Sequence, residues 1–396
     1  MKIFVVGIGV NGENSLTIEA KEAISQAELL IGAERMTKPF SDSGKTIENA
    51  CLAQDIADIL EKSNFETAAV LMSGDCGFFS GAKKLLPLLE CHEVTIISGI
   101  SSMAYFCGKI GISYENMRFI SLHGRHGNIA INTLFSEKCF ILLGGEMTVA
   151  DVCQRLCDYG LSGVTVHVGE NLGYKNEQVV SFKASEFRDD MTSKLSVLVT
   201  ENPDFLRFIP CSISDDRFIR GSVPMTKSIV RGNIVSSLEI GKNDICWDIG
   251  CGTGSISIEM AFRCTDGMVY AFDKNSEAIE LTVRNSKRFG CDNITAIDGI
   301  CPDILGNFEV PNKVFIGGSS GNMDEIFKCI YNKNPCADIA VSAVSLETLT
   351  QAQEAFETFG GEYSIVQIAV TETRKIGNHT MLSAQNPVFI IRGKLQ

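Results

Sequence analysis

A glycine-rich loop in the second half of the chain could hold a nucleoside against the backbone. Residues 246–255 read CWDIGCGTGS, an apolar run that passes through Asp248 into three alternating glycines, Gly250, Gly252 and Gly254. Because glycine has no Cβ, the chain can turn sharply there and let a ligand approach the backbone closely. An apolar run that leads through such a loop into a predicted helix is typical of a nucleotide-binding strand–turn–helix unit.

An acidic residue, Asp273, ends the next apolar run, residues 268–273, 19 positions after Gly254. A carboxylate at the tip of the second strand can accept hydrogen bonds from both hydroxyls of a ribose. The loop lacks the Gly-Lys-Ser/Thr of a phosphate-binding loop and the third-glycine spacing of a dinucleotide fingerprint. We therefore expect a nucleoside without a pyrophosphate, and S-adenosyl-L-methionine is the leading candidate.

A second glycine loop lies at the start of the chain. Gly7, Gly9 and Gly12 fit the pattern Gly-x-Gly-x-x-Gly, after a predicted strand and before a predicted helix at residues 15–24. Glu34 follows 22 positions after Gly12, just past the second predicted strand. This pattern is a dinucleotide-binding fingerprint, so the spacing alone leaves NAD binding open for this half.

Short apolar runs alternate with helical patterns along the first half of the chain. This βαβ rhythm predicts an α/β fold with a mostly parallel sheet covered by helices. The predicted strands are residues 3–6, 29–31, 68–72, 94–97, 140–143 and 164–168, with antiparallel additions at 179–182 and 195–200, and the predicted helices include 47–62, 81–89 and 149–159.

After residue 202 the rhythm breaks at a cluster of proline, serine and aspartate, which predicts a linker at 206–224 between domains at 1–205 and 225–396. Beyond the linker, seven strands with helices between them fit one doubly wound domain. These strands are predicted at 244–248, 268–273, 294–298, 313–316, 337–342, 363–371 and 387–392, and the last two are expected to form a hairpin.

Composition restricts the class of protein. The 396 residues suggest two domains, since domains hold roughly 100–200 residues. No apolar run approaches the roughly 20 residues of a membrane helix, and a net charge of −13 argues against nucleic-acid or membrane-surface binding. The 15 cysteines include no Cys-x-x-Cys pair, so we expect free thiols in a reducing cytoplasm and no metal site.

Five segments of the C-terminal half form a recognisable set: FIRGSVPMTK (218–227), WDIGCGTGSISIE (247–259), VFIGGS (314–319), AVSLET (343–348) and NPVFI (386–390). Together they resemble the class I S-adenosyl-L-methionine-dependent methyltransferases, and among them the decarboxylating C-15 methyltransferases of corrin-ring synthesis. The resemblance implies a Rossmann-like fold with a seven-stranded sheet. It implies that the donor is held by Thr226, Asp248, Gly250, Gly252, Thr253, Gly254, Asp273, Gly317 and Gly318.

This half departs from the family pattern at one position. Ile300 stands where family members usually carry an acid, just after the third predicted strand. Either Asp298 or backbone groups would then have to contact the adenine.

Four separated segments mark the N-terminal half: SGDCGFF (73–79), SGISS (98–102), LHGR (122–125) and VGENLG (168–173). With Gly7 and Gly9 they resemble the tetrapyrrole methylases, and most closely the C-5 methyltransferases of the same pathway. The resemblance implies a class III methyltransferase of two αβα lobes, with a folded donor held by Gly7, Gly9, Gly74, Asp75, Ser101 and Ser102. Cys76 replaces a usual proline, and Gly144-Gly145 replaces a usual Thr-Asp step.

The two resemblances concern consecutive steps of one pathway. They imply a bifunctional enzyme of cobalamin (vitamin B12) biosynthesis that methylates a corrin precursor, precorrin-6B/6Y or its cobalt form, at C-5 and C-15. Decarboxylation of the C-12 acetate would accompany the second methylation. They also imply one S-adenosyl-L-methionine per domain, a small-molecule tetrapyrrole substrate and a homo-oligomer.

The expected substrate carries several carboxylates, whereas the chain is acidic overall, so local cations must bind the substrate. Arginine can do so with two parallel hydrogen bonds. The candidate cations are Arg125, Arg217, Arg220, Lys227 and Arg231. Two histidines, His123 and His379, are candidate proton carriers, and His379 is the one that we assign to the decarboxylation.

Other functions remain open at this stage. The N-terminal half could bind NAD, or it could be a non-catalytic tetrapyrrole-binding domain fused to a class I methyltransferase. RNA methylation is a further possibility for a class I fold, but the chain lacks a basic stripe.

Overall fold

The computed structural model describes residues 1–122, 127–188 and 196–395. Contacts divide the chain into two compact units. The first comprises the described parts of Met1–Arg125, Lys138–Asp151 and Thr165–Glu201, and the second comprises those of His126–Glu137, Val152–Val164 and Asn202–Gln396. Two short pieces of the first half of the sequence therefore belong to the second unit.

The first unit begins with a parallel five-stranded sheet in the order β3-β2-β4-β1-β5. Both faces of its strand β1 (Lys2–Gly7) are buried, because alternate side chains enter two different apolar clusters, Ile3 and Val5 on one face and Phe4 and Val6 on the other. The elements are β1 (Lys2–Gly7), α1 (Ile18–Gln26), β2 (Leu29–Gly32), α2 (Glu34–Thr37), β3 (Thr46–Asn49), α3 (Ala53–Lys62), β4 (Thr67–Met72), α4 (Ala82–Leu85) and β5 (Glu93–Ile97).

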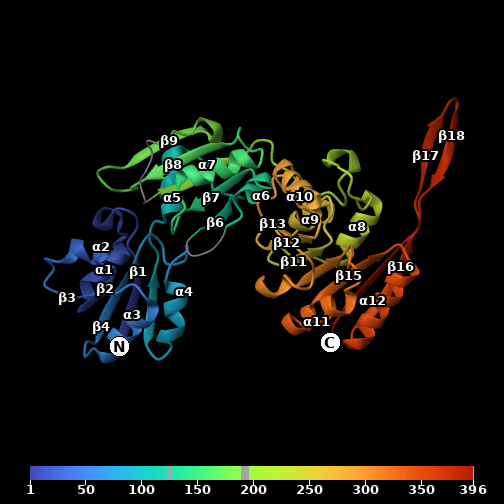
Figure 1. Ribbon diagram of the computed structural model, residues 1–396. Helices are drawn as coiled ribbons and strands as arrows, with labels where there is room; N and C mark the ends of the chain where they lie inside the picture. The colour runs from blue at the N-terminus through green and yellow to red at the C-terminus, as the bar shows by residue number, and fades with distance from the viewer. Residues whose placement is uncertain (123–126, 189–195, 396) are drawn as a thin grey trace. The chain divides into compact units, whose positions relative to one another are not determined.

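A second five-stranded sheet follows, in the order β6-β7-β10-β8-β9, with only the β6–β7 pair parallel. The elements along this stretch of the chain are α5 (Ser102–Ile110), β6 (Arg118–Ser121), α6 (Ile129–Leu134), β7 (Lys138–Leu142), α7 (Val149–Asp158), β8 (Thr165–Glu170), β9 (Gln178–Lys183) and β10 (Ser196–Glu201). Of these, α6 and most of α7 belong to the second unit. Short 3-10 turns lie at Gly12–Ser15, Lys38–Phe40, Leu86–Leu89 and Ala184–Glu186. The two sheets and their helices (Figure 1) confirm the predicted two-lobed α/β first half.

One predicted helix of this half is wrong in its first part. The helix expected over 47–62 starts only at Ala53, and Thr46–Asn49 instead forms β3 beside β2. Ile47 packs against an apolar cluster of the sheet, so tertiary pairing decides the conformation of this segment.

The second unit contains a seven-stranded sheet in the order β13-β12-β11-β14-β15-β19-β16. β19 is antiparallel to both neighbours, and the other pairs are parallel. This confirms the Rossmann-like fold and the pairing of the two terminal strands. The elements are α8 (Ser228–Ser237), β11 (Ile245–Ile249), α9 (Ser255–Ala261), β12 (Met268–Asp273), α10 (Ser276–Arg288), β13 (Ile294–Asp298), β14 (Lys313–Ile316), α11 (Met323–Lys333), β15 (Asp338–Ala343), α12 (Leu346–Thr358), β16 (Glu362–Ile368) and β19 (Val388–Lys394), with 3-10 turns at Asp215–Arg217 and Leu305–Asn307.

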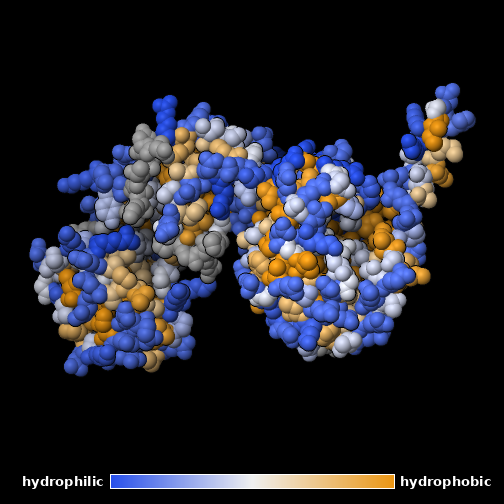
Figure 2. Space-filling view, in the orientation of Figure 1, coloured by the Kyte–Doolittle hydropathy of each residue, from blue (hydrophilic) through white to orange (hydrophobic). Residues whose placement is uncertain are grey.

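A hairpin that the sequence did not predict lies between the last two strands of this sheet. β17 (Thr371–Ile376) and β18 (His379–Ala384) pair only with each other and project from the sheet (Figure 1). Every residue of both strands is exposed, including the apolar Ile376, Met381 and Leu382. Figure 2 shows hydrophobic residues among the hydrophilic ones on the projecting arm.

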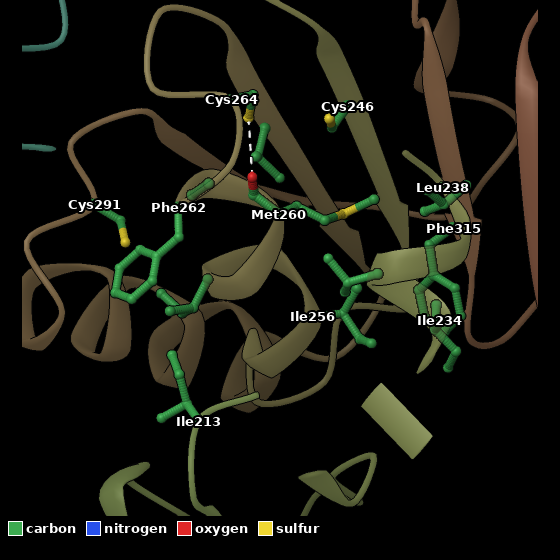
Figure 3. Packing of buried hydrophobic residues seen from close by; sticks show 14 of the residues in the cluster. Ile213, Ile234, Leu238, Cys246, Ile256, Met260, Phe262, Cys264, Cys291 and Phe315 are labelled. Carbon is green, nitrogen blue, oxygen red and sulfur yellow. Dashed lines mark hydrogen bonds between the residues drawn. The ribbon is translucent and has the colours of Figure 1, made fainter. Parts of the chain in front are cut away.

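Cysteines behave as small core residues. All 15 are free, and nine are buried. Figure 3 shows Cys246, Cys264 and Cys291 among the apolar side chains of the second unit, with the Cys264 thiol donating to the Met260 carbonyl at 3.3 Å. Burial raises the pKa of Cys291 well above its usual value, so this thiol stays neutral. In the described part of the chain, no helix is long and apolar enough to cross a membrane.

A buried carboxylate joins α6 to the rest of the second unit. The Asp292 side chain is 1% exposed and accepts three backbone hydrogen bonds, from Ile129 at 2.8 Å, Ala130 at 2.9 Å and Ile131 at 3.0 Å. These donors form the first turn of α6, where backbone N–H groups have no partner within the helix. Asp292 therefore caps a helix that comes from a distant part of the sequence.

Replacing this cap should destabilise the protein. In Asp292→Ala the three buried N–H groups lose their acceptor, so the free energy of unfolding should fall by about 2 kcal/mol or more in urea denaturation. The exposed Asp303→Ala serves as the control and should change it by less than about 0.5 kcal/mol. Equal stability of the two variants would show that the cap contributes nothing.

Candidate active sites

The glycine loop after β11 lies against the segment after β14. Gly250 has a φ of 78°, a conformation that favours glycine, and a Cβ built on it would lie 2.8 Å from the backbone nitrogen of Gly318. The backbone N–H of Gly317 donates to the carbonyl of Ile249 at 2.8 Å. β11 and β14 flank the point where the strand order reverses, and open α/β sheets bind ligands at such a point.

Asp273 holds this loop from the neighbouring strand. Its carboxylate accepts hydrogen bonds from the backbone nitrogens of Gly252 at 2.9 Å and Asn275 at 3.0 Å. A carboxylate has about four acceptor positions, so these two bonds leave capacity for ribose hydroxyls. Asp273 can therefore position the loop and still contact a ligand.

A cavity of about 260 Å³ opens at this edge of the sheet. Five of the predicted donor residues line it: Thr226, Gly250, Asp273, Gly317 and Gly318. Three others shape the turn without lining the cavity: Gly252, Thr253 and Gly254. Sequence reasoning missed several lining residues, chiefly Lys274, Cys301, Ser319 and Ser320. Of these, Lys274 could have been found, since it directly follows the acid at the end of the second strand.

The cavity lining includes Ile300, which stands where the family usually carries an acid. Ile300 lines the cavity and is 51% exposed, whereas Asp298 is absent from the residues that line it. An apolar side chain thus occupies the position where an acid was expected, and an adenine contact of Asp298 or of backbone groups remains a prediction.

Asp248 lies behind the loop and not in the cavity. Its side chain is fully buried, and it accepts a short hydrogen bond from the hydroxyl of Ser257 in α9. Burial raises the pKa of Asp248 to about 7, and the nearby Asp273 carboxylate adds to this increase. Asp248 thus supports the loop through the helix that follows it.

Arg231 is a structural residue, so its prediction as a substrate contact is wrong. Its side chain is 0% exposed, and its guanidinium donates to Glu259 at 2.6 Å and to Asp215 at 3.2 Å. It also donates to the Thr226 carbonyl at 2.6 Å. Since Thr226 lines the cavity, the buried arginine fixes the segment that forms one side of the site.

The other candidate cations of this half are exposed. Lys227 lies 3.8 Å from Asp215, the guanidinium of Arg217 lies 5.5 Å from the ring centroid of Phe289, and Arg220 is exposed. None of the three lines the cavity, although Pro224 and Thr226 from the same segment do. Their substrate contacts remain predictions.

The first glycine loop meets two other loops at the carboxyl edge of the first sheet. Gly9 and Gly74 exchange backbone hydrogen bonds of 3.0 Å in both directions. A Cβ on Gly7 would lie 2.7 Å from the Gly99 nitrogen and 2.8 Å from the Gly74 carbonyl oxygen. The loops after β1, β4 and β5 are therefore in backbone contact that no larger residue permits.

Polar side chains fix these three loops. Asp75 accepts a hydrogen bond from the backbone nitrogen of Gly99 at 3.0 Å. Ser101 caps α5 by accepting from the Ala104 nitrogen at 3.1 Å, and Ser102 is the first residue of that helix. All six predicted donor residues of this half therefore come from adjoining loops at one sheet edge.

The strand order argues against the NAD alternative. β4 separates β2 from β1, so the end of β2, near Glu34, does not adjoin the glycine loop as a dinucleotide fold requires. Moreover, α1 begins at Ile18, six residues after Gly12, and Thr17 already caps it. No helix N-terminus therefore follows the loop directly, as a pyrophosphate would require.

Of the two predicted proton carriers, the structure describes only His379. His123 and Arg125 lie outside the described residues. His379 is the exposed first residue of β18 in the projecting hairpin, and it does not line the cavity. Proton delivery by His379 therefore remains a prediction, because no contact within the described part of this chain places His379 at the cavity.

The raised pKa of Asp248 predicts a pH effect on stability. The folded-state value of about 7 exceeds the roughly 3.9 of an unfolded aspartate, so folding retains a proton that the unfolded chain releases. This contribution to stability is present below about pH 4 and disappears as the pH rises to about 7. Asp248→Asn cannot titrate, so its free energy of unfolding relative to wild type should increase over that range, on the order of 1–3 kcal/mol in urea titrations. A difference that stays constant with pH would contradict the expectation.

Two family models match the chain, one over each half. A family model described as a precorrin methyltransferase domain matches residues 217–393, and one for tetrapyrrole (corrin/porphyrin) methylases matches residues 2–188. A probable cobalt-precorrin-6B C(15)-methyltransferase (decarboxylating) from Pyrobaculum calidifontis is 36% identical over 182 residues, which are 45% of this chain and 93% of that protein.

Two further comparisons concern proteins named for both positions. A precorrin-6Y C(5,15)-methyltransferase (decarboxylating) from Sinorhizobium sp. is 26% identical over 395 residues, covering 97% of this chain and 94% of that protein. A crystal structure of a precorrin-6Y C5,15-methyltransferase from Geobacter metallireducens is 32% identical with a TM-score of 0.45, over 48% of this chain and 98% of that one. The chain therefore belongs to the precorrin-6Y C(5,15)-methyltransferases (decarboxylating), and its tetrapyrrole methylase match precedes its precorrin methyltransferase match.

Proposed function

We propose that the chain methylates a corrin precursor, precorrin-6B/6Y or its cobalt form, at two positions in cobalamin biosynthesis. The domain at 1–205 would methylate C-5, and the domain at 225–396 would methylate C-15 and decarboxylate the C-12 acetate, with 206–224 as the linker. The observation that carries this proposal is the pair of glycine loops, one at the strand ends of each half, in a chain that matches a two-position relative along 97% of its length.

Each half would hold one S-adenosyl-L-methionine. The backbone contacts at Gly250 and Gly7 would set the shape of the two donor sites, because a Cβ at either position would collide with the neighbouring loop. Asp273 and Gly317 would hold it in the second half, and Gly74 and Ser101 in the first. When bound, this molecule supplies a methyl group on a sulfonium, which is already a good leaving group, so the protein has mainly to position the reactants.

The ring itself would supply the remaining chemistry. The bridging carbons of a reduced corrin precursor are enamine-like nucleophiles, so methylation needs no strong base from the protein. Loss of carbon dioxide from a ring acetate leaves an electron pair that a conjugated imine of the ring can accept, and a proton then completes the product. The chain would contribute orientation, exclusion of water and cations for the ring carboxylates.

The wider setting follows from the same proposal. Free cysteines in both units are compatible with a reducing cytoplasm, where we place the enzyme as a homo-oligomer.

Separate inactivation of the two sites tests the division of labour. Wild-type protein incubated with the donor and the precursor should add two methyl groups and release one carbon dioxide, as measured by mass spectrometry. Asp273→Ala should lose the second methylation and the decarboxylation, because its glycine loop is no longer held, while it retains the first methylation. Asp75→Ala should show the reverse pattern. If wild-type protein adds only one methyl group and binds one donor per chain by calorimetry, the N-terminal half would instead be non-catalytic.

Charge reversal tests the predicted substrate cations. Arg220→Glu and Lys227→Glu should raise the KM for the precursor in C-15 methylation about tenfold or more, because a carboxylate would face the substrate carboxylates. Lys242→Glu, whose side chain is 63% exposed, is the matched control and should leave KM unchanged. An unchanged KM in both test variants would remove these residues from the substrate site.

A further inference from the structure

An apolar pocket in the first unit is lined by none of the predicted donor residues. Its volume is about 610 Å³, within the range of about 300–1,000 Å³ that is usual for small-molecule sites. The pocket is lined by Cys76, Gly77, Phe78, Phe79, Ser80, Ala82, Lys83, Leu86, Ile96 and Phe119. It begins one residue after Asp75, so a single short loop connects the candidate donor site to the pocket.

Aromatic rings form the pocket wall. The ring of Phe78 makes edge contacts with Phe79 at 4.9 Å, Phe119 at 5.4 Å and Phe140 at 5.6 Å between centroids. Phe140 is fully buried and anchors the group, whereas Phe79 is 51% exposed and Phe119 is 39% exposed. Ile96, which also lines the pocket, is 52% exposed. Three large apolar side chains left uncovered around one hollow indicate a surface that an apolar ligand covers.

Phe79 is held in an unfavourable backbone conformation. Its φ is 47°, which is unusual for a bulky residue and persists only where the surroundings impose it. The loop before it is fixed at the donor end, because the two oxygens of Asp75 accept from Gly77 at 2.8 Å and Gly99 at 3.0 Å. The Cys76 thiol donates into the first sheet, to the Val5 carbonyl at 3.4 Å.

One cation stands in this otherwise apolar lining. Lys83 lines the pocket from α4 and is exposed, and the lining contains no aspartate or glutamate. The adjacent Lys84 is also exposed but does not line the pocket. The pocket therefore combines aromatic faces with a single positive charge, which suits a flat apolar ring that carries carboxylates.

We propose that this pocket binds an edge of the tetrapyrrole ring during C-5 methylation, with the ring face on Phe79 and Phe119 and a carboxylate at Lys83. The inference rests on the proposed function and adds the place and the mode of substrate binding in the first half. The loop at 74–79 then positions the ring relative to the donor, since its first residues belong to the donor site and its last to the pocket.

Uroporphyrin, a tetrapyrrole with carboxylates on its side chains, is a suitable probe for the full chain. Its own fluorescence reports binding in titrations. Phe119→Ala and Lys83→Glu should raise the Kd for uroporphyrin at the pocket of the first unit about tenfold or more. The matched controls are Phe208→Ala, a phenylalanine that is 76% exposed elsewhere, and Lys84→Glu, and both should bind as wild type does.

A third variant separates binding from folding. Glycine adopts a positive φ without strain, so Phe79→Gly should weaken uroporphyrin binding without lowering the melting temperature. Unchanged binding in Phe119→Ala, Lys83→Glu and Phe79→Gly, or no binding by wild type, would overturn the proposal. A change in sedimentation of Phe119→Ala without a change in affinity would also overturn it, because a second copy would then cover the pocket. Calorimetry with S-adenosyl-L-methionine distinguishes failure of the pocket proposal from failure of the proposed function. Donor binding persists if only the pocket proposal fails.

Discussion

Both candidate sites depend on one steric constraint, which is that two backbone segments approach more closely than any side chain permits. In the first unit the constraint lies between Gly7 and the loops after β4 and β5, and in the second it lies between Gly250 and Gly318. A methyl group at either position would force the loops apart and change the edge at which a ligand can bind. Strands β1, β4, β11 and β14 are buried over most of their length, so they cannot shift to relieve such a collision.

The two units differ in topology, but the same kind of hydrogen bond fixes the glycine loops in both. In each, an aspartate at a strand end or in the following loop accepts a backbone hydrogen bond from a neighbouring glycine, Asp75 from Gly99 and Asp273 from Gly252. A glycine loop is costly to order because its unfolded chain is so free. The carboxylates offset part of that cost, so the loops are organised before any ligand arrives.

Charge is distributed to match this arrangement. The chain is acidic overall, yet the fully buried cation, Arg231, serves the structure by tying the Thr226 segment to Glu259. Cations that can reach a substrate are instead exposed at the edges of the sites, such as Lys274 at the second cavity and Lys83 at the aromatic pocket. An anionic ring would therefore meet positive charge only locally, which favours orientation of the ring over general attraction to the surface.

The sequence by itself determined the α/β class, both glycine loops, the acid at Asp273 and the inert role of most cysteines, because these depend on local periodicity and on residue types with a single physical use. It could not determine which strand lies beside which, and that order is what argues against a dinucleotide site near Glu34. Nor could it reveal that Arg231 is buried, that Asp292 caps a helix about 160 residues away, or that His379 lies on a projecting hairpin. Each of these depends on contacts between distant segments, and only the tertiary structure decides which segments meet.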